Sequence, residues 1–416
     1  MAADGVRQAV VLAGGRGERL LPLTLTRPKA MVEVHGRPFL AYLVEMLRDQ
    51  GIERVLLLLG YLPDPIIDYF GDGSAFGVRI DYDVTPPDDP TSARLLHARE
   101  RLDHVFLMLY CDNYWPLSLD RHWARFRDAG APALVTVYRN GDGATRDNVR
   151  IDADGFVEVY DGGRSEPGLQ GNEIGYAIVE RHLLDLLPDG SQPVERALYP
   201  ILVGDRRLAA LVTDHRYYSV GSHERLPATE RFLARRPTLF LDRDGVLNRR
   251  PAVAEYIRRP EDVEWLPGAL DAVRRLTQAG VRLIVISNQA GIARGAMSTA
   301  DLDAVESRMR ADIAATGGQI EAFLYCPHGW DEGCTCRKPR PGLLFEAQRR
   351  YDLDLTRTPF LGDDARDGEA AAAAGSPFVL VTDDHSLADA TDSYLAGDQF
   401  AMTTPLHAAD AHGVPA

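Results

Sequence analysis

Thr238-Leu-Phe-Leu-Asp-Arg-Asp-Gly-Val-Leu-Asn248 is the stretch that decides how the second half of the chain folds. Its first four residues predict a short buried strand, and Asp242 and Asp244 follow that strand directly. Gly245 then allows the chain to turn away sharply. Two carboxylates at this spacing can meet in one small site, where one attacks phosphorus and the other handles the proton of the leaving group. Their charge calls for a cation, and Mg²⁺ prefers oxygen ligands.

The same alternation of strand and helix runs outward from this stretch in both directions. We predict strands at 8–12, 54–59, 104–110, 282–287 and 360–362 and helices at 39–48, 267–279 and 302–315. Alternating strands and helices predict parallel sheets with ligands at the carboxyl ends of the strands. The predicted fold class is α/β, with two domains at 1–235 and 236–416, each a mostly parallel sheet flanked by helices. After Ser393 the chain turns into short pieces rich in Ala, Asp, Gly and His, and we expect a mobile end over the last ten residues.

Three further polar positions lie near the ends of predicted strands in the second half. Ser287 ends one strand, Asp363 follows another, and Lys338 stands in Cys336-Arg-Lys-Pro. In this order the pieces resemble the haloacid dehalogenase superfamily of aspartyl phosphatases. The resemblance implies that Asp242 is the nucleophile and Asp244 the general acid and base. It also implies that Ser287 and Lys338 hold the phosphoryl group, and that Asp363 binds Mg²⁺ with Asp242 and the backbone of Asp244.

Three of the four cysteines cluster in Cys326-Pro-His328-Gly-Trp-Asp-Glu-Gly-Cys334-Thr-Cys336. Three thiols and one imidazole within eleven residues form the ligand set of a structural zinc site. We therefore predict zinc here rather than a disulfide. The loop continues directly into the lysine segment, so the metal would fix the direction of Lys338.

Within the superfamily, the metal loop and Ser287-Asn-Gln-Ala-Gly-Ile-Ala-Arg294-Gly resemble the D-glycero-D-manno-heptose 1,7-bisphosphate 7-phosphatases. This resemblance places Asn288 and Arg337 among the phosphate-binding residues and assigns Arg294 to the phosphate that is not cleaved. The histidinol-phosphate phosphatases share the metal loop and the Asp-x-Asp pair. The spacing from His328 to Cys334 is closer to that second type. The Gly-Ile-Ala-Arg-Gly segment nevertheless favours the heptose substrate, with histidinol phosphate as the alternative.

The first half carries a glycine loop after its first predicted strand. Leu12-Ala-Gly-Gly-Arg-Gly-Glu-Arg-Leu-Leu-Pro-Leu-Thr-Leu-Thr-Arg-Pro-Lys29 brings backbone N–H groups and cations together, as phosphate binding requires. The string resembles the sugar-1-phosphate nucleotidyltransferases. The resemblance implies that Gly14, Gly15, Arg19 and Lys29 bind nucleotide phosphates. Asp112, just after a predicted strand, would bind the catalytic Mg²⁺.

Other parts of the first half depart from that family pattern. Pro90-Thr-Ser-Ala-Arg94 replaces a glycine-rich segment, and Arg164 stands near the place of a lysine that meets the sugar phosphate. Ser219 occupies the position of a second metal-binding aspartate, for which Asp214 is a candidate substitute. Two hypotheses follow. The domain joins heptose 1-phosphate and a nucleoside triphosphate into NDP-heptose, or it is a catalytically impaired nucleotide- or sugar-binding regulatory module.

Composition limits the partners that the chain can have. A net charge of −15 disfavours nucleic acids and anionic membranes, and no apolar run is long enough to span a bilayer. The N-terminus lacks the layout of a signal peptide, so we expect a cytoplasmic enzyme that binds a sugar phosphate and a nucleoside triphosphate. Among 46 basic residues only Lys29 and Lys338 are lysines. We infer that each stands where a planar guanidinium does not fit.

Overall fold

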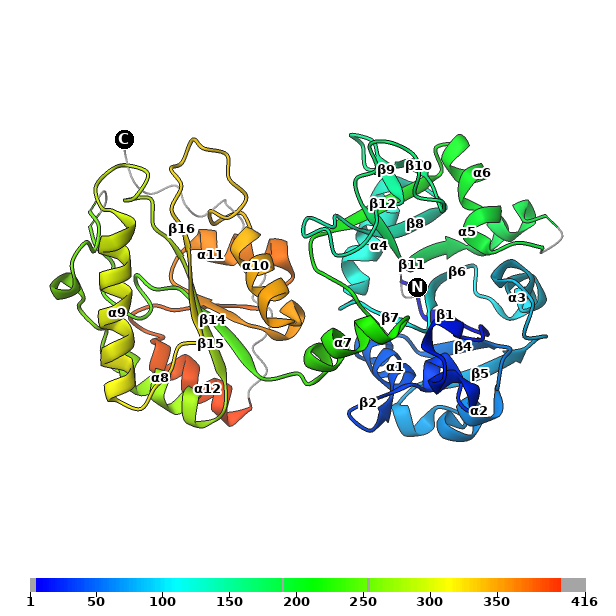
Figure 1. Ribbon diagram of the computed structural model, residues 1–416, viewed down its shortest axis with the longest axis horizontal. Helices are drawn as coiled ribbons and strands as arrows, with labels where there is room; N and C mark the ends of the chain where they lie inside the picture. Colours follow the sequence, from blue (N-terminus) through cyan, green and yellow to red (C-terminus); the bar gives the residue numbers. More distant parts are fainter. Residues whose placement is uncertain (1–4, 189–190, 253–254, 398–416) are drawn as a thin grey trace. The chain divides into compact units, whose positions relative to one another are not determined.

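Two α/β units, residues 1–234 and 235–416, make up the chain in the computed structural model (Figure 1). The structure describes residues 5–188, 191–252 and 255–397. In these ranges no helix combines the length and the apolar character that a bilayer crossing needs.

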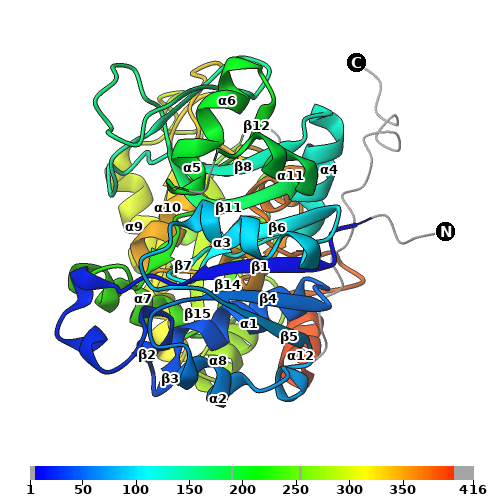
Figure 2. The same cartoon turned by 90° about the vertical axis from the view of Figure 1, so that its right-hand side faces the viewer.

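A seven-stranded sheet forms the centre of the first unit, in the order β12-β8-β11-β6-β1-β4-β5. Six consecutive buried residues make β1 a central strand, and Figure 2 shows it between β6 and β4. The neighbouring strands pair in parallel except at β11, which is antiparallel to both β6 and β8. The strands of this sheet are β1 (Gln8–Ala13), β4 (Arg54–Leu59), β5 (Arg79–Val84), β6 (Val105–Tyr110), β8 (Ala133–Tyr138), β11 (Asn172–Glu180) and β12 (Leu208–Thr213).

Helices and small two-stranded sheets complete this unit. The helices are α1 (Phe39–Asp49), α2 (Asp64–Phe70), α3 (Thr91–His97), α4 (Leu119–Ala129), α5 (Val194–Ala197), α6 (Tyr199–Gly204) and α7 (Leu226–Leu233). The small pairs are β2 (Glu33–Val34) with β3 (Arg37–Pro38), β7 (Asn113–Tyr114) with β13 (Tyr218–Ser219), and β9 (Val149–Ile151) with β10 (Val157–Tyr160).

The second unit has a five-stranded sheet in the order β16-β15-β14-β17-β18, with every pair parallel. Its strands are β14 (Thr238–Leu241), β15 (Arg282–Asn288), β16 (Ala322–Cys326), β17 (Phe360–Gly362) and β18 (Phe378–Leu380). Its helices are α8 (Ala269–Gln278), α9 (Thr299–Ala315), α10 (Gly342–Tyr351), α11 (Ala365–Ala374) and α12 (Leu387–Ala396).

Alternation along β14 produces two separate cores in the second unit. Leu239 and Leu241 join the apolar cluster that includes residues of α8, α9 and α12, whereas Phe240 joins the cluster with α10 and α11. Side chains at successive strand positions point to opposite faces, so helices cover both sides of the sheet. The predicted fold class is confirmed. Helix α12 continues past Ser393 to Ala396. The last ten residues lie outside the described ranges.

Candidate active site

The central strand of the second sheet positions the main polar group of the unit. Since β14 pairs in parallel with β15 and β17, residues at the ends of these strands meet at one edge. The ammonium of Lys338 lies between two carboxylates there, 2.9 Å from Asp242 Oδ1 and 2.6 Å from Asp367 Oδ1. It also donates a hydrogen bond to the carbonyl of Ile286 (2.9 Å). Burial raises the pKa of Asp242, and the Lys338 ammonium opposes that rise.

Asp244 points to a different set of partners. The guanidinium of Arg243 donates to both carboxylate oxygens of Asp244, at 3.0 and 2.9 Å. The side-chain amides of Asn248 and Gln289 donate to the same carboxylate at 2.9 and 3.0 Å. Burial alone would raise the pKa of Asp244, but Arg243 and these hydrogen bonds bring it below its usual value. Sequence reasoning missed Arg243 and Gln289 as partners of Asp244.

Three carboxylates form a group that fits a hard cation. Oxygen atoms of Asp242, Asp363 and Asp367 all lie within 4.8 Å of one another. Gly245 has a φ of 99°, and a Cβ at that position would lie 1.7 Å from Asp363 Oδ2. Glycine is therefore required for the close approach of Asp363 to the Asp-x-Asp turn. An all-oxygen donor set is the type that Mg²⁺ prefers. Burial raises the pKa of Asp363 to about 6, although Arg250 opposes the shift.

Sequence reasoning missed Asp367, which follows Asp363 by one helical turn. Asp364 caps α11, and this cap directs the first turn of the helix back toward the strand ends. The spacing Gly362-Asp-Asp-x-x-Asp367 was the available signal. Asp244 contributes no side-chain oxygen to the carboxylate group found among the described residues, and its predicted role used the backbone.

Asn288 contacts the backbone of Lys338, and Ser287 is the preceding residue at the end of β15. The side chain of Asn288 donates to the carbonyl of Lys338 and accepts from its N–H, both at 3.0 Å. These two hydrogen bonds attach the loop that carries Lys338 to the end of β15. Ser287 is buried, and its hydroxyl accepts a hydrogen bond from Gln289 (3.1 Å). A cavity of about 360 Å³ opens above this group, and its lining includes all the predicted phosphate-binding residues, namely Ser287, Asn288, Arg294, Arg337 and Lys338.

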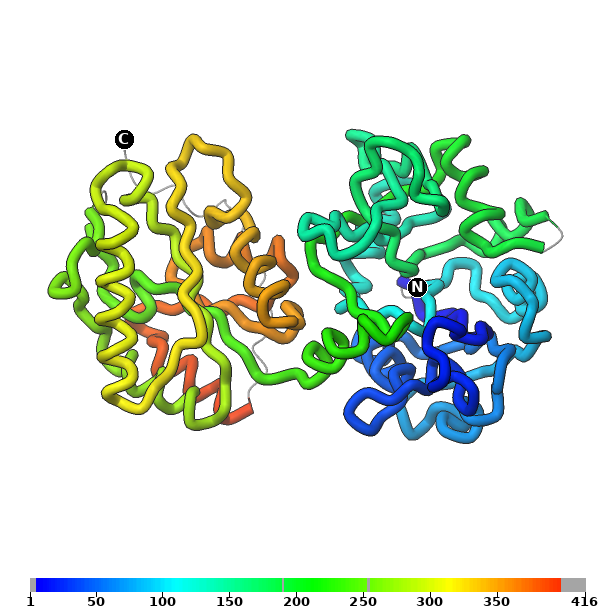
Figure 3. Tube along the Cα trace, viewed as in Figure 1, coloured from blue at the N-terminus to red at the C-terminus, as the bar shows by residue number. Residues whose placement is uncertain are grey.

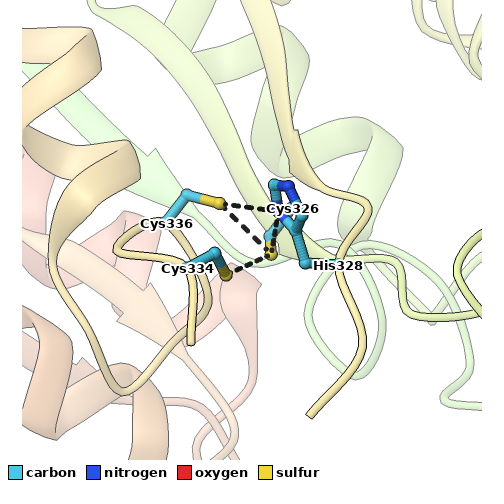
Figure 4. A group of neighbouring side chains, drawn as sticks. All are labelled: Cys326, His328, Cys334 and Cys336. Carbon is cyan, nitrogen blue, oxygen red and sulfur yellow. Dashed lines mark hydrogen bonds between the residues drawn. The ribbon is translucent and has the colours of Figure 1, made fainter. Parts of the chain in front are cut away.

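The chain leaves β16 in a long loop before α10, as the trace in Figure 3 shows, and this loop carries the cysteine cluster. Figure 4 shows Cys326, His328, Cys334 and Cys336 turned toward one another. The sulfur of Cys326 lies 3.6 Å from His328 Nδ1, 3.7 Å from the sulfur of Cys334 and 3.4 Å from that of Cys336. Zinc–sulfur bonds of about 2.3 Å in a tetrahedron place sulfurs about 3.8 Å apart, so the spacing fits this metal.

In the first unit two of the predicted phosphate residues, Arg19 and Lys29, lie near Asp112, which follows β6. Lys29 forms an ion pair with Asp112. A Cβ at Gly221 would lie 3.0 Å from Ser219 Oγ, 3.2 Å from Asp112 Oδ2 and 3.6 Å from Arg19 Nη2. The structure therefore brings Arg19, Lys29, Asp112 and Ser219 to one place. The hydroxyl of Ser219 accepts a hydrogen bond from the N–H of Gly221 (2.9 Å), at the position where a second metal-binding carboxylate was expected.

The glycine loop of the first unit lies against a buried arginine. Arg94 is 2% exposed, and its guanidinium carbon would be 2.3 Å from a Cβ at Gly14. Its N–H groups donate to the carbonyl of Leu59 and the hydroxyl of Thr85, both at 2.6 Å. Gly15 has open space around it. The segment that departs from the nucleotidyltransferase pattern thus fills the space beneath Gly14 with a cation.

Two other sequence candidates have different partners. Asp214 is paired with Arg139 (3.2 Å) at the end of β8. Arg164 donates to the carbonyl of Arg146 (2.7 Å) and to Asn172 Oδ1 (3.3 Å), so part of its donor capacity is already used.

Comparison with known proteins gives two different family matches, one within each unit. A family model described as nucleotidyl transferase matches residues 8–155, and a HAD-hydrolase-like model matches residues 335–403. D-glycero-β-D-manno-heptose-1,7-bisphosphate 7-phosphatase of Bordetella bronchiseptica is 44% identical over 145 residues, which are 35% of this chain and 80% of that protein. D-glycero-α-D-manno-heptose-1,7-bisphosphate 7-phosphatase of Mycobacterium bovis is 40% identical over 143 residues, 33% of this chain and 75% of that protein.

The B. bronchiseptica heptose bisphosphate phosphatase crystallised with magnesium and phosphate is a structural neighbour. It has a TM-score of 0.37 and 37% identity, and the match covers 39% of this chain and 99% of that one.

The chain is thus an enzyme in which a haloacid dehalogenase-like phosphatase follows a nucleotidyl transferase domain. Because it matches four fifths of a relative at 44% identity, it belongs to the heptose-1,7-bisphosphate 7-phosphatase family.

Proposed function

We propose that the second unit removes the 7-phosphate of D-glycero-D-manno-heptose 1,7-bisphosphate through an aspartyl-phosphate on Asp242. The observation that carries this proposal is the buried ammonium of Lys338 between Asp242 and Asp367, at the floor of the 360 Å³ cavity. A cation in this position can attract a phosphate group and hold it against the Asp242 carboxylate. The choice of substrate in this proposal follows from the family membership of the chain. We also propose that the phosphatase domain begins near residue 235.

In the proposed reaction an oxygen of Asp242 attacks phosphorus, and the bond between phosphorus and the sugar oxygen breaks. The carboxyl of Asp244 gives the leaving oxygen its proton, which requires that it first turn from Arg243. Water then attacks phosphorus, transfers its proton to Asp244, and releases phosphate with the free Asp242 carboxylate. Arg243 favours the ionised form of Asp244, and this form suits the base of the second step.

Two metals complete the proposal. Asp242, Asp363 and the backbone of Asp244 would hold Mg²⁺, which when bound offsets the negative charge of the phosphoryl oxygens and of the carboxylates. Cys326, His328, Cys334 and Cys336 would hold zinc, which would fix the loop that leads into Lys338.

The experiment is a phosphate-release assay with both anomers of the heptose bisphosphate, since relatives carry both names. Asp242→Asn should abolish release while the thermal unfolding temperature stays close to that of the wild type. Retained turnover in this variant would refute the nucleophile. Histidinol phosphate is the matched alternative substrate, and its preferential hydrolysis would leave the reaction class but replace the substrate.

For the first unit we propose transfer of a nucleotide to the heptose 1-phosphate that the second unit releases. The gathering of Arg19, Lys29 and Asp112 after β1 and β6 supports this activity. A specific observation favours the second candidate, a binding module without transfer, because a hydroxyl, that of Ser219, stands where the family pattern has its second metal-binding carboxylate. Pyrophosphate release with each nucleoside triphosphate separates the two. Ser219→Asp should increase that release if transfer is the activity, and no pyrophosphate from either protein would establish the binding module.

A further inference from the structure

An unusually exposed tryptophan lies on the cysteine loop, at the rim of the phosphatase cavity. Trp330 is 66% exposed, more than any other large apolar side chain in the described ranges. It stands between His328 and Cys334, and its ring is one wall of the 360 Å³ cavity. An indole this exposed contributes little hydrophobic stabilisation, so its position calls for another physical reason.

Two guanidinium groups lie over this ring. The guanidinium carbon of Arg294 is 5.0 Å from the ring centroid, and that of Arg337 is 5.8 Å from it. Both distances are within the range of cation–π attraction, for which tryptophan is the strongest partner. The two arginines come from different segments, one after β15 and one from the loop before α10. Trp330 therefore links cations from two segments that meet at the cavity.

Neither arginine has a carboxylate partner among the residues that the structure places. Arg294 donates to the hydroxyl of Tyr256 (2.9 Å), and Arg337 makes one long contact with the carbonyl of His328 (3.4 Å). Other arginines at this site are paired, such as Arg250 with Asp363 (2.8 Å). In a chain with 61 acidic and 46 basic residues, two uncompensated guanidiniums at one cavity are a local concentration of positive charge.

The way in which an aromatic ring attracts a guanidinium explains why an indole suits this position. A carboxylate would hold an arginine by its N–H edge and would compete directly with an incoming phosphate. An aromatic face attracts the guanidinium through its plane instead, so the N–H edges stay available for an anion. We propose that Trp330 is a positioning residue that holds Arg294 and Arg337 for the phosphate group that is not cleaved. The inference rests on the proposed bisphosphate function, and it makes Trp330 a determinant of the preference for a second phosphate.

The test compares Trp330→Leu and Trp330→Phe with the wild type on two substrates. Heptose 1,7-bisphosphate carries the second phosphate, and p-nitrophenyl phosphate lacks it. Trp330→Leu should raise KM for the bisphosphate by about 3- to 30-fold and leave kcat close to the wild-type value. Trp330→Phe should restore most of that loss, because it retains an aromatic face. Neither variant should change the kinetics of p-nitrophenyl phosphate or the zinc content.

Each contrary result has a separate meaning. An equal loss on both substrates would show that Trp330 only supports the loop, and an unchanged KM for the bisphosphate in Trp330→Leu would show that it does not position the arginines. Failure of Trp330→Phe to restore KM would overturn the cation–π argument. A wild-type enzyme without preference for the bisphosphate would refute the proposed substrate, and this inference with it.

Discussion

Replacing Lys338 by methionine should destabilise the second unit by about 3–5 kcal/mol, because it would leave two buried carboxylates without their cation. The side chains of Lys338, Asp242 and Asp367 are 3%, 9% and 1% exposed, so water cannot replace the ammonium. Methionine retains the length of the side chain, so most of the packing should survive. The expected loss therefore reports charge compensation rather than a cavity.

The assay is urea unfolding of the full chain in EDTA, with the transition of the second unit followed by circular dichroism. Asp367→Asn in the Lys338→Met background is the matched control, since it removes one of the two orphan carboxylates. The free energy of unfolding of the double variant should exceed the value expected from the sum of the two single changes by at least about 1 kcal/mol. Adding Mg²⁺ should also stabilise the single variant, because a divalent cation then offsets the same carboxylates. A Lys338→Met protein as stable as the wild type in EDTA would refute the reasoning, as would a loss that Asp367→Asn leaves unchanged.

Three further changes address the metals and the first unit. Gly245→Ala should lower phosphatase kcat by about 100-fold, because the new Cβ would lie 1.7 Å from Asp363 Oδ2. The measurement is kcat over a Mg²⁺ titration, and a kcat equal to that of the wild type would contradict this prediction. Cys334→Ser should lower the zinc measured in the purified protein together with phosphatase activity, whereas unchanged zinc would exclude the cluster. Burial lowers the pKa of His122 from 6.5 to about 4, so the unfolded chain takes up this proton first as the pH falls. The first unit should therefore lose about 3 kcal/mol of stability between pH 6.5 and 4, a loss that His122→Gln removes in urea titrations followed by Trp115 fluorescence.

The sheet edge could be predicted from the sequence because parallel strands end together. Asp242, Ser287 and Asp363 each follow or end an apolar strand, so their meeting depends only on strand order. Asp367 could not be placed in this way, since its contact with Lys338 depends on how the first turn of α11 is directed by the Asp364 cap. A helix turn near a strand end has several possible directions, and tertiary packing selects one of them.

Partners within the site were harder to predict than the site itself. Arg243 stands between two aspartates just after the strand ends at Leu241, and its guanidinium returns to Asp244, a contact that the sequence reasoning did not anticipate. Asn288 was predicted to bind phosphate, and the sequence did not reveal that its side-chain amide also bonds the backbone of Lys338. Such hydrogen bonds depend on a long-range approach of two loops, which no local pattern encodes.

The two lysines of the chain show how far composition alone could reach. Lys338 lies in a space closed by Asp242, Asp367 and the carbonyl of Ile286, where a planar guanidinium would need more room than one ammonium. Lys29 is likewise paired with Asp112, the residue to which the nucleotidyltransferase resemblance assigns Mg²⁺ binding. In both units, then, a lysine neutralises a carboxylate that a charged ligand would later engage. A phosphate entering either site competes with that carboxylate for the ammonium, and a metal competes with the ammonium for the carboxylate. On the proposed function, joint binding of a metal and a phosphate would exchange one set of ion pairs for another, so each site would bind the two together better than either one alone.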